Sequence, residues 1–259
     1  MSVRLIARLD IKMSNLIKGV QMEGWRKMGD PADRARKYYA EGADELLYMD
    51  VVASLYERNN LVDIVRDVAT DAFVPMTVGG GIDSLEAAKA LLDVGADKVA
   101  VNTAATKRPS LLNEISDTYG SQALVLSVEA KALPSGGWTA MTDNGRNHTG
   151  RDVLAWVEEA ATRGVGEFLI TSIDRDGVGR GADLDLVSAV TDAVDVPVIA
   201  AGGLASAEHV REAVARGVSA VAIAKALHTD ALSLIDLRQE LARTGTSVRP
   251  FAMEEAPGV

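Results

Sequence analysis

Two carboxyl side chains each end a short apolar run of the sequence. Asp10 closes the segment RLIARLDIK and Glu129 closes ALVLSVEAK, and a lysine follows each of them two residues later. A partly desolvated carboxyl group can be tuned toward neutral pH, so a pair of them can act as general acid and general base. The alternative is that each carboxylate only pairs with its neighbouring lysine, Lys12 or Lys131, or with loop amides.

Two glycine pairs indicate phosphate binding. Gly80-Gly81 lies in VGGGI and Gly202-Gly203 lies in AAGGL, and each pair precedes a predicted helix with a serine near its start, Ser84 or Ser206. Backbone amides approach a phosphate closely only where no side chain intervenes, and a helix N-terminus adds a favourable dipole. We therefore expect one phosphate site in each half of the chain, although a lone glycine pair usually marks only a tight turn.

Other polar or small residues follow the apolar runs at positions suited to holding a substrate. In a barrel of parallel strands, the reacting groups lie at the carboxyl ends of the strands. Besides the glycine pairs, the predicted substrate-binding residues are Lys18, Asp50, Asn102, Thr103, Thr171, Asp176, Gly177, Ala224 and Lys225, and Thr77 is a further strand-end candidate. Two phosphate sites and one carboxyl group in each half indicate a long substrate phosphorylated at both ends. Its reactive middle would lie between Asp10 and Glu129.

Eight short apolar runs alternate with longer stretches of helical periodicity, a pattern typical of βα units around a buried parallel sheet. The runs lie near residues 4–9, 45–50, 75–79, 97–101, 122–128, 167–171, 197–201 and 219–224. The helical stretches lie near residues 31–41, 59–71, 84–93, 109–118, 151–163, 184–193, 206–216 and 231–243. This arrangement predicts an α/β fold, a single (β/α)8 TIM barrel.

The first half of the chain matches the second at a constant offset of 122 residues. GADELLYMDVV at 42–52 falls on GVGEFLITSID at 164–174, and GADKVAVNTA at 95–104 falls on GVSAVAIAKA at 217–226. The repeat predicts one barrel domain over residues 1–249, built from half-barrels at about 1–122 and 123–249. Residues 250–259 contain two prolines and little periodicity, so we expect a flexible C-terminal tail.

Two connections are too long to be simple turns. They span residues 13–29 and 132–149, and both follow a strand, so both belong to the catalytic face of a barrel. Long βα loops in a compact domain are more often lids or binding loops than idle connections. The second contains PSGG and DNG, which are typical of a small hairpin.

Composition excludes several other classes of protein. The 259 residues are 47% hydrophobic and carry a net charge of −10, which opposes a broad contact with nucleic acid or with an anionic membrane. The absence of cysteine removes disulfides and thiolate chemistry, and three histidines are too few for a multi-histidine metal site. The charged N-terminus lacks the apolar run of a signal peptide. We expect a cytoplasmic enzyme without a metal or an organic cofactor.

Several motifs together resemble one enzyme family. They are LDIK at 9–12, GDP at 29–31, VGGGI at 78–82, DKVAVNTAA at 97–105, TSIDRDG at 171–177 and AAGGL at 200–204. The chain is similar to the cyclase subunit of imidazole glycerol phosphate synthase, of histidine biosynthesis, up to about residue 249. The resemblance implies a lyase-type reaction in which ammonia and a bisphosphorylated ribulosyl formimino carboxamide ribotide give imidazole glycerol phosphate and an aminoimidazole carboxamide ribotide.

The chain departs from the family pattern where substrate is held. The family uses two aspartates as acid and base, of which the first matches Asp10 and the second falls on Glu129. Glutamate keeps the charge but moves the carboxyl group outward, and a misplacement of about 1 Å can cost on the order of a hundredfold in rate. Serines of the family are replaced by Ala100, Ala201 and Lys225, although a lysine can still contact phosphate as a point charge.

The resemblance also implies a partner. In the family, a charged ring at the closed end of the barrel gates the entry of ammonia from a glutaminase (glutamine amidotransferase) subunit, and the matching residues are Arg4, Glu45, Lys98 and Glu167. Asp97 is the corresponding docking residue, so we expect a heterodimer with a glutaminase. The alternative is that these four charges form a salt-bridged plug of the barrel.

Two other functions fit the same residues. The first is a paralogue with the same ammonia-coupled barrel that acts on another substrate, for instance in sugar amidination for surface-polysaccharide synthesis. A gene neighbourhood of histidine genes or of sugar-nucleotide genes would separate it from the cyclase. The second is a non-catalytic subunit that activates a glutaminase, which predicts that replacing Asp10 or Glu129 leaves the biological role intact.

Overall fold

A closed ring of eight parallel strands forms the centre of the computed structural model, which describes residues 2–53 and 61–251. In ring order, the strands are β1 (Arg4–Lys12), β4 (Glu45–Asp50), β5 (Met76–Gly79), β6 (Lys98–Val101), β7 (Leu124–Ala132), β10 (Glu167–Ser172), β11 (Val198–Ala201) and β12 (Ala220–Ile223). Pairing of β12 with β1 and of β7 with β10 closes the ring. The predicted (β/α)8 TIM barrel is confirmed.

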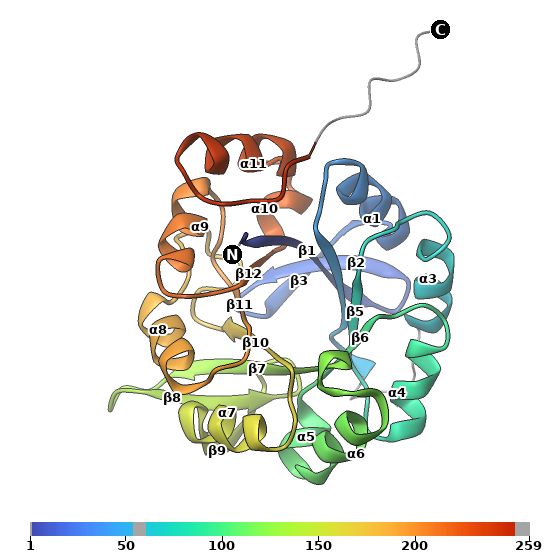
Figure 1. Ribbon diagram of the computed structural model, residues 1–259, viewed down its shortest axis with the longest axis vertical. Coiled ribbons are helices and arrows are strands. Elements are labelled where there is room, and N and C mark those ends of the chain that lie inside the picture. The colour runs from blue at the N-terminus through green and yellow to red at the C-terminus, as the bar shows by residue number, and fades with distance from the viewer. Residues whose placement is uncertain (1, 54–60, 252–259) are drawn as a thin grey trace, which may run out of the picture.

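Helices surround this ring on its outer side (Figure 1). They are α1 (Pro31–Ala40), α3 (Leu61–Val68), α4 (Leu85–Leu92), α6 (Ser110–Tyr119), α7 (Val153–Thr162), α8 (Leu184–Ala193), α9 (Ala207–Val214) and α11 (Leu234–Arg243). The main apolar core lies between them and the outward faces of the strands, with Tyr38, Trp156 and Phe168 among its largest buried side chains. Residues 54–60, which include the start of the stretch expected to be helical from 59, and residues 252–259 of the expected tail lie outside the described residues.

Matching turns follow strands at positions 122 residues apart. Ser84 caps α4 by accepting from the Ala87 amide at 3.2 Å, and Ser206 caps α9 by accepting from the His209 amide at 3.3 Å. Short helices α5 (Thr103–Lys107) and α10 (Lys225–His228) also occupy equivalent places after β6 and β12. These likenesses support the half-barrel interpretation, which stays a prediction.

The two long connections each contain a β-hairpin. The second was expected to form one, and it does so with β8 (Trp138–Thr142) and β9 (Asn147–Asp152). The first, residues 13–29, was expected to be a lid or binding loop, with no strands assigned to it, and it forms β2 (Asn15–Val20) and β3 (Glu23–Gly29). The prediction missed this hairpin because Gln21 and Met22 make its turn with positive φ angles of 52° and 62°, without the glycine that usually signals such a turn.

The inside of the barrel is layered. Side chains two residues apart on β1 point to the same side. The interior side of β1 therefore carries, from its amino end to its carboxyl end, Arg4, Ile6, Arg8 and Asp10. Arg4 belongs to a charged ring at the amino end of the strands, and Ile6 belongs to an apolar layer with Leu47, Met49, Ala100, Val125, Leu169, Ile199, Ala201, Ala220 and Ala222. Arg8 and Asp10 begin the polar layer at the carboxyl ends, which we call the mouth.

Candidate active site

Asp10 lies buried at the mouth between two cations. Its Oδ1 accepts from Arg8 Nε at 2.8 Å and its Oδ2 accepts from Lys18 Nζ at 2.6 Å. Lys18 comes from the β2–β3 hairpin and also donates to Asp176 Oδ1 at 2.9 Å. Burial alone would raise the pKa of Asp10, but the charges of Arg8 and Lys18 and their hydrogen bonds hold that pKa well below its usual range. Asp10 is therefore a carboxylate at any physiological pH.

Arg8 is a site residue that the sequence analysis did not identify. Its side chain is 6% exposed, and its Nη1 donates to Thr171 Oγ1 at 2.9 Å. The signal was present in the sequence, because Arg8 has the same strand parity as Arg4 and Asp10. The expected site residues were the last polar residues of the strands, and Arg8 lies two residues before the one on β1, Asp10.

Glu129 is also buried at the mouth, but in a different electrostatic setting. Its Oε2 accepts from the backbone amide of Gly145 at 2.7 Å, and this is the only side-chain hydrogen bond of the group among residues 2–53 and 61–251. Burial raises the pKa of Glu129 to about 7, against the opposing effects of the Gly145 amide and the positive charge of Arg8. Near neutral pH, Glu129 can thus both give and take a proton.

One cavity, of about 230 Å³, lies beside the second glycine pair. Its lining includes seven predicted residues: Lys18, Asp176, Gly177, Gly202, Gly203, Ala224 and Lys225. Gly202 has a φ of +96°, and a Cβ there would lie 2.7 Å from the Ser172 carbonyl oxygen. The turn itself therefore requires glycine, as expected if a glycine pair marks a tight turn. Lys225 Nζ donates to the Gly177 carbonyl at 2.7 Å, so this ammonium group already lies at the cavity.

A second cavity, of about 240 Å³, lies beside the first glycine pair. It is lined by Asp50, Gly80, Gly81, Asn102 and Thr103, all predicted, together with Glu129 and Arg8. Burial raises the pKa of Asp50, and its Oδ2 is buried without a hydrogen-bond partner among the described residues. A buried oxygen without a donor favours the protonated form of the carboxyl group, in agreement with the raised pKa.

Two predicted residues lie elsewhere. Thr171 does not line either of these two cavities; its Oγ1 accepts a hydrogen bond from the guanidinium of Arg8. Thr77 was expected to end its strand, and this is wrong, because β5 continues to Gly79 and Thr77 pairs in register with Lys98 near the other end. The expected run at 75–79 agrees with β5, so the error lay in taking its last polar residue as the end of the strand, although two residues, Val78 and Gly79, follow it.

The two hairpins meet over the mouth. The ring of Trp25, on β3, lies 5.0 Å from Lys12 Nζ and 5.3 Å from Arg146 of the β8–β9 turn. The Gln21 amide donates to the Asp176 carbonyl at 2.7 Å. Trp25 was not singled out from the sequence, although an aromatic residue in a long connection was a usable signal. These contacts hold both hairpins over the mouth, where Asp10 and Glu129 lie.

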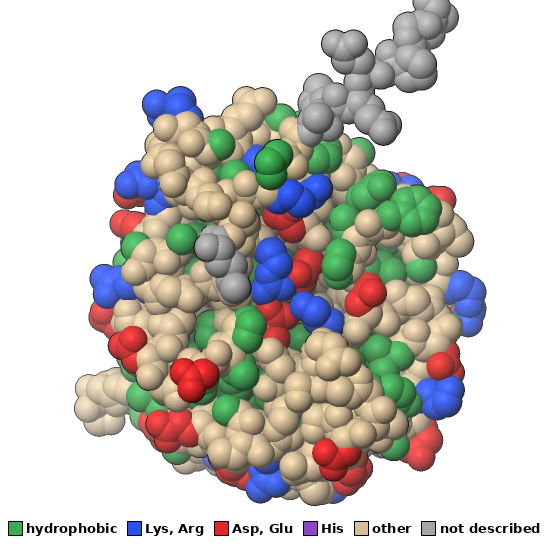
Figure 2. All heavy atoms as spheres, viewed as in Figure 1, with side chains coloured by type: hydrophobic (Ala, Val, Ile, Leu, Met, Phe, Trp, Pro, Cys, Tyr) green, Lys and Arg blue, Asp and Glu red, His purple; other side chains and the backbone are tan. Residues whose placement is uncertain are grey.

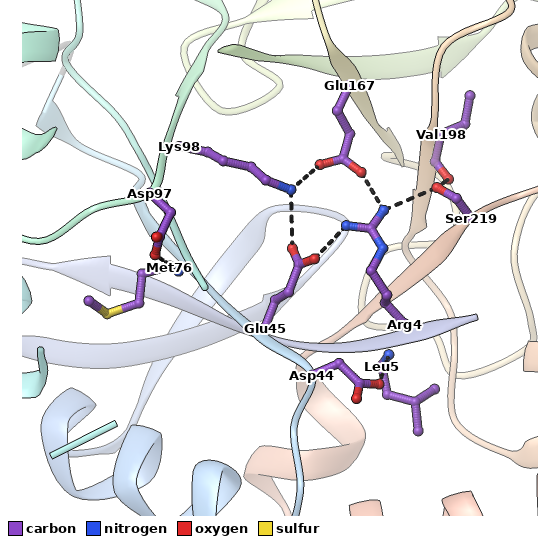
Figure 3. Close-up of polar contacts among 10 residues, drawn as sticks. All are labelled: Arg4, Leu5, Asp44, Glu45, Met76, Asp97, Lys98, Glu167, Val198 and Ser219. Carbon is purple, nitrogen blue, oxygen red and sulfur yellow. Dashed lines mark hydrogen bonds and ion pairs between the residues drawn. The ribbon is translucent and has the colours of Figure 1, made fainter. Parts of the chain in front are cut away.

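The four predicted gate residues form a closed ring of ion pairs at the opposite end of the barrel (Figure 3). Arg4 contacts Glu45 and Glu167, and Lys98 Nζ contacts Glu167 at 2.8 Å and Glu45 at 3.5 Å. The neighbouring Asp97 is exposed, and its carboxylate accepts from the Met76 amide at 2.8 Å. The structure therefore brings the four charges together in one ion-paired ring at the amino ends of the strands.

Within the described ranges, neither a metal cluster nor a membrane-crossing helix is found. Residues 2–53 and 61–251 contain no group of three or more histidine, cysteine or acidic side chains placed to hold a metal ion. None of the helices in these ranges is long and apolar enough to cross a membrane.

Comparisons with known proteins found a matching family and similar proteins. The profile of a family described as "Histidine biosynthesis protein" matches residues 4–233. A protein of Legionella pneumophila named "Imidazole glycerol phosphate synthase subunit HisF" is 57% identical over 207 residues, which cover 80% of this chain and 98% of the relative. A protein of the same name from Thermobifida fusca (strain YX) is 44% identical over 254 residues, which cover 96% of this chain and 99% of the relative.

Proposed function

Because the chain belongs to the histidine biosynthesis protein family, we propose that its barrel mouth carries out the ammonia-dependent cyclisation of imidazole glycerol phosphate synthase. The chain is a lyase-type cyclase subunit. Its substrate is the bisphosphorylated ribulosyl formimino carboxamide ribotide, and its products are imidazole glycerol phosphate and aminoimidazole carboxamide ribotide. The single observation that carries this proposal is the pair Asp10 and Glu129, which are buried at one mouth with pKa values shifted in opposite directions.

The pair accounts for the first step of the reaction, in which ammonia replaces the carbonyl oxygen of the ribulosyl group; ring closure and release of the aminoimidazole carboxamide ribotide follow it. When ammonia adds to the ribulosyl carbonyl, the nitrogen becomes positively charged and must lose protons, while the carbonyl oxygen must leave as water. Asp10, held as a carboxylate by Arg8 and Lys18, faces the developing positive charge and stabilises it. Its lowered pKa makes it a weak base, so the ionised fraction of Glu129 accepts the proton from nitrogen. Glu129, protonated in a large fraction of molecules near pH 7, donates a proton to the departing oxygen.

The two glycine-lined cavities are proposed to hold the two phosphates. Backbone amides of the Gly80-Gly81 and Gly202-Gly203 turns precede the capped helices α4 and α9, whose N-termini favour anions. Arg8 borders both cavities and Glu129 borders one of them, so the middle of a substrate that spans them passes the carboxyl pair. A short phosphate or sulfate soak should therefore place two anions, one beside Gly81 and Asn102 and the other beside Gly203 and Lys225.

A glutaminase subunit is proposed to deliver ammonia at the other end. The relatives are named as subunits, which implies a complex. Figure 2 shows acidic and basic side chains gathered at the centre of the face that carries the N-terminus. Ammonia released there would pass the ring formed by Arg4, Glu45, Lys98 and Glu167, and Asp97 would contact the partner. The cytoplasmic location predicted from the composition stays a prediction.

The proposed reaction is tested by supplying ammonia directly. Purified protein, an ammonium salt at alkaline pH and the authentic bisphosphorylated intermediate should give imidazole glycerol phosphate, detected by chromatography. No product from folded protein and authentic substrate would contradict the histidine-pathway function.

A paralogue that acts on another substrate is the second candidate. It is favoured by the departures from the family pattern, of which Ala100, Glu129 and Lys225 line the two cavities and Ala201 lies in the apolar layer beneath them. The gate ring is intact. Sugar-nucleotide genes and a second cyclase gene beside this one would support the paralogue, whereas histidine genes would support the cyclase.

A further inference from the structure

We propose that Arg8 is a specificity-determining residue that binds an oxygen atom at the centre of the substrate. This inference rests on the proposed function for the identity of the substrate. It concerns Arg8, a side chain that the proposed function uses neither for proton transfer nor for phosphate binding. Three observations carry it: the place of Arg8 between the two cavities, its partly occupied donors and the charge balance around it.

Arg8 is the one residue that lines both cavities within the part of the chain that the structure describes. Every other lining residue belongs to one cavity or the other. A ligand with one phosphate in each cavity must therefore run across the guanidinium of Arg8. The contact falls near the ligand's midpoint, which is also where the reaction is proposed to take place.

The guanidinium has donors left for a ligand. Its Nε donates to Asp10 and its Nη1 to Thr171, at 2.8 and 2.9 Å. Nη2 has no hydrogen-bond partner among residues 2–53 and 61–251, and it is not among the buried atoms that lack one, so it is accessible from the cavity. Because two fixed bonds orient the planar fork, Nη2 presents its N–H groups without further loss of side-chain freedom.

The charges around Arg8 favour an electron-rich but uncharged acceptor. Arg8 and Lys18 balance Asp10 and Asp176, and Glu129 is neutral in a large fraction of molecules at pH 7. An added carboxylate would disturb this balance, whereas a carbonyl or carboxamide oxygen accepts the bond without adding a charge. In the proposed substrate, the ribulosyl carbonyl is such an oxygen, and a hydrogen bond from Arg8 would polarise it toward ammonia.

The test uses binding, so that it does not depend on turnover. Two linear bisphosphates of equal length serve as probes, one with a ketone at its centre and one with a methylene there. Calorimetry on wild-type protein should show roughly tenfold tighter binding of the ketone. Arg8→Met should bind both probes equally. Arg8→Lys, which keeps the charge balance but loses the fork, should retain only part of the preference.

The matched control is Arg211→Met on the outer helix α9, where the arginine pairs with exposed Glu208. This variant should discriminate like wild type. Circular dichroism establishes that each variant is folded, and Arg8→Lys keeps the test decisive if Arg8→Met does not fold. Equal loss of affinity for both probes would mean that Arg8 only positions Asp10, and an unchanged ketone preference in either Arg8 variant would also overturn the proposal.

The binding result is distinguishable from failure of the cyclase function. If the ketone preference depends on Arg8 but the histidine-pathway substrate is not converted, Arg8 still binds a central oxygen, and the chain is the paralogue that acts on another substrate. If the substrate is converted but Arg8→Met retains the ketone preference, the cyclase function stands and the role of Arg8 is withdrawn.

Discussion

Glu129 Oε2 accepts a hydrogen bond of 2.7 Å from the backbone amide of Gly145, which joins strand β7 to the turn of the β8–β9 hairpin. Gly145 has a φ of 74°, so the amide is presented by a conformation that favours glycine. The bond lowers a pKa that burial raises, and the balance leaves Glu129 near 7. The hairpin thus helps to set the pKa of the proposed acid–base group Glu129.

Glu129 should make the protein less stable as the pH rises. A raised folded-state pKa means that the native state binds more protons than the unfolded state between about 4.5 and 7, so stability is lost across this window. The loss attributable to this group is about 3 kcal/mol at most. Urea unfolding at pH 5 and pH 8 should show a smaller decline for Glu129→Gln than for wild type. An identical decline would show that Glu129 is not buried as described.

Asp10→Asn should remove catalysis and weaken the fold. It leaves Arg8 and Lys18 without their shared carboxylate, and breaking a buried ion pair costs about 3 to 5 kcal/mol. The measurement is ammonia-dependent turnover beside complementation of a strain that lacks the gene. Wild-type complementation by both Asp10→Asn and Glu129→Gln would support the non-catalytic, glutaminase-activating alternative instead.

A change in the charged ring should slow the reaction with ammonia from the glutaminase more than the reaction with an added ammonium salt. Lys98→Met removes the cation between Glu45 and Glu167. With the cognate glutaminase and glutamine, we expect the rate to fall roughly tenfold, whereas the rate with ammonium salt stays within about twofold. Lys89→Met, which removes an exposed lysine paired with Asp93, is the matched control. Equal effects on both ammonia sources would favour the plug interpretation.

Trp25→Ala should loosen the contact between the hairpins. Two cation–π contacts, with Lys12 and Arg146, disappear, and each is worth on the order of 1 kcal/mol. We expect KM to rise about tenfold with a smaller change in kcat. Phe73→Ala, which removes a side chain 77% exposed in the connection before β5, should leave both constants unchanged. A change confined to kcat would contradict a role in holding substrate.

The fold could be predicted from the sequence because the sequence patterns that indicate it are local and repeated. Apolar runs, serine caps such as Ser84 and Ser206, and glycine turns recur at a fixed offset, and a barrel places their ends together. The two carboxyl groups were found for the same reason. The protonation difference between Asp10 and Glu129 was not readable, because it depends on Arg8, Lys18 and Gly145, which reach the site from the strand interior and from two hairpins.

The central claim is tested most directly by ammonia-dependent turnover of the bisphosphorylated intermediate by wild type, Glu129→Gln and Glu129→Asp, at fixed free ammonia across pH 6 to 9. Wild type should turn over with a rate that falls as the pH rises through about 7, since the proton on Glu129 is lost there. Glu129→Gln should lose at least about a hundredfold, and Glu129→Asp should keep or raise activity if the reaction is the family's own. Equal rates and equal pH profiles for all three proteins would contradict the claim that this carboxyl pair performs the reaction.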